Sequence, residues 1–114
     1  MMMNAARIAS TGLAVESRRM AVSADAVANV NTDGYRAKEV VAEERAEGGV
    51  GSSVREQPGE SPVAERDGAR VFLSNTSVAR ETVTRIQASR AFQANLAVIR
   101  TSDQMTQSLL DIVG

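Results

Sequence analysis

The sequence contains no cysteine, histidine or tryptophan, and its only aromatic residues are Tyr35, Phe72 and Phe92. Without thiolates and imidazoles it has no zinc site of the usual kind, no cysteine nucleophile and no histidine for proton transfer. Lysine occurs once, as Lys38, so no activated nucleophile is evident. We therefore predict no catalytic residues, no metal and no cofactor. A small hydrolase that uses two carboxylates brought together by folding remains an alternative.

The chain also lacks a basic region and a long apolar run. Its 13 basic and 14 acidic residues give a net charge of −1, and no basic stripe is available to neutralise phosphates, which argues against a nucleic-acid partner. No run of 18 apolar residues occurs, so we predict no membrane insertion. The first residues are interrupted by Arg7, Ser10 and Thr11, unlike a cleavable signal peptide. If the protein is exported, we expect the export route not to cleave a signal peptide.

Three zones divide the chain, whose 114 residues leave room for one small domain. Residues 1–30 lack proline and predict an N-terminal helix. Residues 31–76 hold both prolines and most glycines, and predict a turn, short strands and a flexible loop. Residues 77–114 lack proline and predict a C-terminal helix. The three zones are expected to form one structural unit.

Both terminal zones carry apolar stripes at helical spacing. The first stripe is Leu13, Met20 and Val27, with a parallel row beside it. The second keeps steps of three and four over several heptads, which is typical of a coiled-coil helix, and runs through Val83, Ile86, Phe92, Leu96, Ile99, Met105 and Leu109. We predict a mainly α fold in which the two helices pair as an antiparallel coiled coil. Glu81 and Arg85 are expected to form an exposed ion pair four residues apart.

The segment between the helices begins with a predicted chain reversal at 29–35, where asparagine, aspartate and glycine compete with the helix. Glu39–Ala42 predicts a short strand, and the glycines at 48–51 predict a turn into a second strand at 53–55. Residues 58–68 are interpreted as an exposed or mobile loop. The middle is therefore expected to be irregular or a β-hairpin.

Two motifs at opposite ends of the chain resemble the axial proteins of the bacterial flagellum, the family of rod and hook subunits. One motif ends the first helix, at Asn29, Asn31, Thr32, Gly34 and Tyr35. The other comprises residues 74–81, 88–95 and 99–105. The short middle makes the chain most similar to the small proximal-rod subunit. Asp25-Ala26 departs from the family's adjacent asparagines, and the middle is short even for that subunit.

The resemblance implies a structural subunit that assembles helically through its terminal helices around an export channel. Expected partners are further copies of the chain, other rod and hook subunits, and the flagellar export apparatus. The expected location is the periplasmic rod of the basal body. From the residues alone, a helical hairpin that closes on itself and a free-standing coiled-coil adaptor or export-associated protein remain alternatives.

Overall fold

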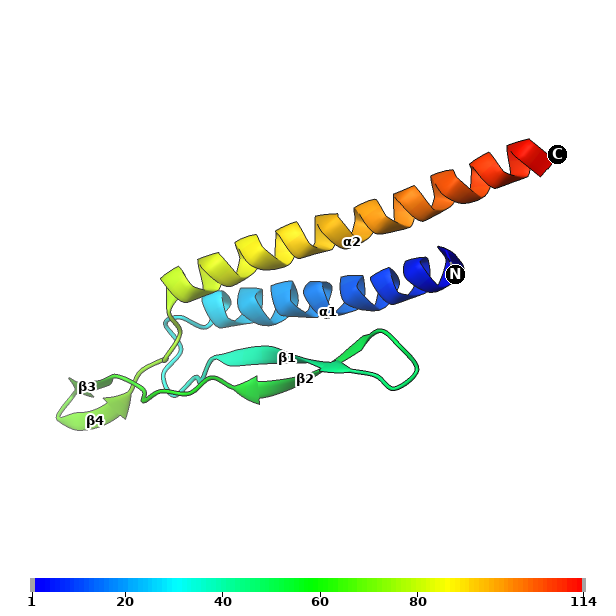
Figure 1. The fold of residues 1–114 in the computed structure, drawn as a ribbon. Helices are drawn as coiled ribbons and strands as arrows, with labels where there is room; N and C mark the ends of the chain where they lie inside the picture. Colours follow the sequence, from blue (N-terminus) through cyan, green and yellow to red (C-terminus); the bar gives the residue numbers. More distant parts are fainter. Residues whose placement is uncertain (1, 114) are drawn as a thin grey trace.

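The computed structural model describes residues 2–113 and shows two long helices joined by two β-hairpins (Figure 1). The elements in chain order are α1 (Met2–Ala28), β1 (Lys38–Glu44), β2 (Val50–Glu56), β3 (Val63–Arg66), β4 (Ala69–Phe72) and α2 (Val78–Val113). The molecule is elongated, with extents of 78 × 25 × 14 Å. The predicted mainly α fold with a hairpin-containing middle is confirmed. Met1 and Gly114, the outermost residues of the predicted helical segments, lie outside the described residues.

The two helices run antiparallel, so both ends of the chain lie at the same end of the molecule (Figure 1). Their lengths differ, with 27 residues in α1 and 36 in α2. At about 1.5 Å per residue, α2 is longer by more than two turns, and it continues beyond the start of α1 (Figure 1). Neither helix in residues 2–113 is both long and apolar enough to cross a bilayer.

The helix boundaries follow from local capping. The Ser77 hydroxyl oxygen accepts a hydrogen bond from the Arg80 backbone N–H at 3.3 Å, which makes Ser77 the N-cap of α2. At the other boundary, Asn29 donates from its side chain to the Asp25 carbonyl at 2.8 Å. The Asp25 carbonyl also accepts the Asn29 backbone N–H at 3.1 Å, so both donors of Asn29 close the last turn of α1.

The first hairpin lies along α1. Strands β1 and β2 pair antiparallel from Lys38 opposite Glu56 to Glu44 opposite Val50. The Thr11 hydroxyl of α1 accepts a hydrogen bond from the Val50 N–H at 3.1 Å, and Arg18 donates to the Ser52 carbonyl at 3.1 Å. These bonds come from one side of α1, so the hairpin covers the flank of the helix beside the α2 contact.

The second hairpin replaces the predicted loop. Strands β3 and β4 pair antiparallel through a turn at Asp67 and Gly68, which have φ angles of 51° and 76°. Two successive positive φ values are the requirement of the type I′ turn that aspartate–glycine favours. The loop interpretation was therefore wrong for residues 63–68. This hairpin packs on neither helix and on neither strand of the first hairpin.

Candidate functional site: the helix seam and its continuation

Small and polar side chains form the seam between the helices. Buried residues recur every seven positions on each helix, at Ala9, Glu16 and Ser23 on α1 and at Glu81, Ala88 and Ser102 on α2. Asn95 occupies the intervening position on α2 and is half-buried. Seven-residue spacing is the coiled-coil repeat, so the predicted pairing mode is present with small residues at its core.

A glycine allows the closest approach of the two helices. A β-carbon placed on Gly12 would lie 2.8–3.0 Å from side-chain atoms of Asn95. The Asn95 amide donates to the Ala91 carbonyl of its own helix at 3.0 Å. Gly12 therefore fits against Asn95, and a larger residue at position 12 would displace the Asn95 side chain. Such contacts bring the backbones together and leave little room for large apolar side chains.

Glu81 is the centre of a buried polar cluster at the start of α2. It is 1% exposed, and its carboxylate accepts a hydrogen bond from the Gln57 amide at 2.8 Å. Its backbone carbonyl accepts one from the Ser23 hydroxyl at 3.2 Å. These bonds join α2 to α1 and to the segment after β2. The predicted exposed pair of Glu81 with Arg85 was wrong, because burial directs the carboxylate to Gln57.

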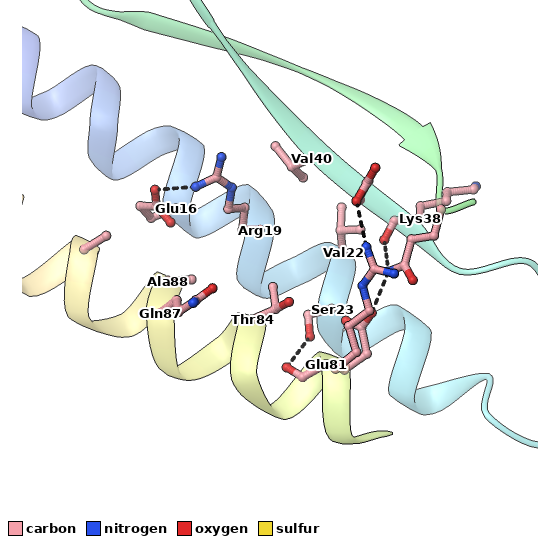
Figure 2. A pocket seen from close by; sticks show the side chains of 14 residues that line it. Glu16, Arg19, Val22, Ser23, Lys38, Val40, Glu81, Thr84, Gln87 and Ala88 are labelled. Atoms are coloured by element: carbon pink, nitrogen blue, oxygen red, sulfur yellow. Dashed lines mark hydrogen bonds and ion pairs between the residues drawn. The ribbon is translucent and has the colours of Figure 1, made fainter. Parts of the chain in front are cut away.

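A polar groove of about 420 Å³ opens beside this cluster, between the two helices and β1 (Figure 2). Charges of both signs line it. Glu16 pairs with Arg19 at 2.9 Å, as Figure 2 shows, and Glu39 pairs with Arg80 at 3.2 Å and with Arg55 at 2.7 Å. Because the ionic groups mostly neutralise one another, the groove has no excess of one charge. No three His, Cys, Asp or Glu residues in the range 2–113 come together as a metal site.

The residues of the family turn hold the chain reversal after α1. Thr32 donates to the Asn29 side-chain oxygen at 3.0 Å, and the Tyr35 hydroxyl donates to the Asp25 carboxylate at 3.0 Å. Gly34 has a φ of 76°, which favours glycine. Its N–H donates to the Phe72 carbonyl at 2.8 Å, which joins the turn to β4. Asn31 is exposed.

Asp25, the departure from the family pattern, is therefore part of this turn. It accepts hydrogen bonds from both Asn29 and Tyr35. Burial first, and then the hydrogen bond to the Asp25 carboxylate, raise the pKa of Tyr35 to about 12. The phenol thus stays protonated as the donor that fixes the turn.

The predicted helix-packing residues occupy two environments. Six of them are half-buried: Leu13, Met20, Val27, Phe92, Leu96 and Ile99. Four are exposed: Val83, Ile86, Met105 and Leu109, with 53%, 48%, 50% and 50% of their surface accessible. The fully buried seam positions were missed as site residues. Their signal is the seven-residue spacing of Ala9, Glu16 and Ser23, which a search for large apolar residues does not detect.

The seam of α2 continues past the last buried residue with larger side chains. Ser102 is 8% exposed, and every residue from 103 to 113 is exposed. The next position in the repeat after Ser102 is Leu109. Together with its neighbours it makes an apolar surface that we call the α2 overhang, formed by Met105, Leu109, Leu110, Ile112 and Val113. An exposed apolar surface of this kind marks an interaction site.

Comparison with known proteins explains this combination of a paired seam and an unpaired continuation. A family model described as Flagella basal body rod protein matches residues 7–36, and one described as Flagellar basal body rod FlgEFG protein C-terminal matches residues 71–112. Flagellar basal-body rod protein FlgC of Salmonella typhimurium is 36% identical over 132 residues, which cover 97% of each chain. The protein of that name from Yersinia enterocolitica is 33% identical with the same coverage.

This chain belongs to the flagellar basal-body rod protein family. The predicted resemblance is thereby confirmed. The two family models match α1 with its turn and α2 with the strand before it, and leave the segment 37–70 between them. The alignment with the relatives spans 132 positions, more than the 114 residues of this chain, so the relatives carry residues that this rod protein lacks.

Proposed function

We propose that this chain is a structural subunit of the flagellar basal-body rod, most like the small proximal-rod subunit. Its terminal helices would assemble helically with further subunits around the export channel. The observation that carries the proposal is the continuation of the helix seam into the exposed α2 overhang, in a chain of the rod protein family. The seam closes the single subunit, and the overhang is left for a neighbour.

Assembly into a helical tube would account for the paired seam and the exposed overhang. A subunit of a helical tube needs contacts that repeat from one copy to the next without closing into a ring. Exposed apolar residues lie both on the overhang and on the paired part of α2, where Val83 and Ile86 are about half accessible. Helices with apolar residues on more than one side can contact a partner in their own chain and a neighbouring subunit at once.

The proposal includes where the chain acts and how it reaches that place. The chain would be exported by the flagellar apparatus without a cleaved signal, would reside in the periplasmic rod, and would contact other rod and hook subunits. It would act by packing alone, without catalysis, metal or cofactor. The residues in the assembly contacts would be the exposed members of the predicted stripe, together with the turn at 29–35 that sets the direction of the hairpins.

Purification of basal bodies tests this proposal. The chain is expected in the rod fraction of purified basal bodies, and cells that lack it are expected to be non-motile. The runner-up hypothesis is a coiled-coil adaptor or export-associated protein, for which the same two-helix pattern is suited. A chain found only in the soluble cytosol, with complete basal bodies that lack it, would reject the rod subunit in favour of the adaptor.

A further inference from the structure

The second hairpin has an apolar surface with no partner among residues 2–113. Val63 and Phe72 lie opposite each other in the β3–β4 ladder and are 41% and 59% exposed. They line a hollow of about 690 Å³ with Arg70 and residues of the Gly34 turn. A two-stranded hairpin that packs on nothing is marginal in water. This hairpin contacts neither helix and neither strand of the first hairpin, so its apolar pair needs an external partner.

The α2 overhang presents the matching kind of surface at the other end of the molecule (Figure 1). At about 100° per residue, its apolar side chains fall on one side of the helix together with Thr106, and the remaining polar residues fall on the other. The register of the helix pair explains why α1 does not cover the overhang. Gly12 lies against Asn95 and Ser23 bonds to Glu81, so in this register the N-terminal start of α1 lies near residue 104 of α2.

The overhang is acidic, whereas the hollow holds charges of both signs. In residues 103–113 the ionic side chains are Asp103 and Asp111, both acidic. The hollow is lined by Arg36, Arg70 and Glu60. Arg36 is held by Glu56 at 3.2 Å and by the Gly59 carbonyl at 2.7 Å, whereas Arg70 makes no ion pair with another residue of the described range. A basic side chain is thus available beside the apolar pair.

We infer that the α2 overhang of one copy docks in the Val63–Phe72 hollow of a second copy, in a head-to-tail arrangement. The overhang extends the interface that the seam already forms and places large apolar residues beyond the reach of α1. Opposite ends of the molecule carry the two halves of the contact, so each copy that binds leaves one half free. Such a heterologous contact propagates along a filament. The inference deepens the proposed function, and it rests on that function for its role in the rod.

Cysteine cross-linking tests the contact directly, because the chain has no cysteine of its own. Ser108→Cys and Glu60→Cys replace exposed residues beside the two apolar surfaces, so the fold and the apolar side chains of the contact are expected to be kept. With a short bismaleimide, a mixture of the two purified single variants is expected to give a cross-linked dimer, while each alone gives none. The chain carrying both cysteines is expected to give a ladder of oligomers. Ser17→Cys, an exposed position on α1, replaces Ser108→Cys as the matched control and is expected to give no product with Glu60→Cys.

A second variant measures the apolar contribution. Leu110→Asp is expected to lower the yield of the head-to-tail cross-link between Ser108→Cys and Glu60→Cys by at least about tenfold, because the overhang loses a large apolar side chain. Gln107→Asp adds the same charge on the polar side of the same helix and is expected to keep the yield.

Each outcome decides the inference separately from the proposed function. A cross-linked dimer from Ser108→Cys alone would mean that two overhangs pair with each other, which overturns the head-to-tail contact. No product in the mixture overturns it as well, even if the chain is found in purified basal bodies. A head-to-tail ladder from a chain absent from basal bodies would keep the contact and reject the rod function.

Discussion

Two stretches of α2 differ in what occupies the same helical repeat. In the paired stretch the positions are Glu81, Ala88, Asn95 and Ser102, and in the overhang the repeat continues with Leu109. The first stretch keeps small or hydrogen-bonded residues because a second helix lies close against it. The second stretch has a large apolar residue that stays 50% exposed in the described part of the chain. Within one helix, therefore, the size of the side chain distinguishes the surface that closes the subunit from the surface left for a neighbour.

The largest expected effect comes from enlarging a paired position. Ala88 is 1% exposed, so Ala88→Leu forces the helices apart and is expected to lower the free energy of unfolding by about 1–3 kcal/mol. Chemical denaturation followed by circular dichroism measures it. Ala94→Leu places the same side chain at an exposed position of α2 and is expected to change little. Equal stability of the two variants would mean that the seam is not closely packed.

The next effect concerns the buried polar group of the same stretch. Glu81→Ala leaves the Gln57 amide without its acceptor in a buried site, and the expected loss is about 1–3 kcal/mol in the free energy of unfolding. Glu81→Gln keeps an oxygen acceptor and should recover part of this loss. Glu44→Ala removes an exposed glutamate as the matched control. If Glu81→Ala costs no more than Glu44→Ala, the cluster does not hold the helices and the hairpin segment together.

A smaller effect is expected at the turn where the helix pair ends. The pKa of Tyr35 is raised from 10.0 to about 12 in the folded chain. The unfolded chain therefore ionises first, and this contribution to stability is complete below pH 10 and is lost as the pH rises to about 12. Denaturation of the wild type and of Tyr35→Phe at about pH 9 and about pH 11 measures it. The wild type should lose more stability than the variant over this interval, and an equal loss would show that folding does not raise the pKa of Tyr35.

Large-scale features were predictable because they depend on patterns that repeat. Two long stretches without proline, each with apolar residues at helical spacing, predicted α1 and α2, and the glycines at 48–51 predicted the first hairpin. The family turn was predicted from its motif, because Gly34 and the asparagines compete with a helix in any context.

The seam residues and the second hairpin were harder to predict, for different physical reasons. Apolar spacing selects large side chains, whereas the helices meet through Ala88, Gly12 and a buried Glu81 whose environment comes from residues 24 and 58 positions away. The charged surroundings of Asp67-Gly68 suggested a loop, although the dipeptide itself is a strong hairpin signal. Only the three-dimensional pairing shows that Val83 and Ile86 lie outside the seam.

The most direct test of the account compares assembly with folding in one overhang variant. Leu109→Asp combined with Leu110→Asp should leave the free energy of unfolding of the purified monomer within about 0.5 kcal/mol of a control, because the two side chains are 50% and 66% exposed. Gln104→Asp with Gln107→Asp carries the same charges on the polar side of that helix and serves as the control. The measurement is the amount of each variant in purified basal bodies. The account predicts that the leucine variant is absent and the glutamine variant is present, and incorporation of both at wild-type level would contradict it.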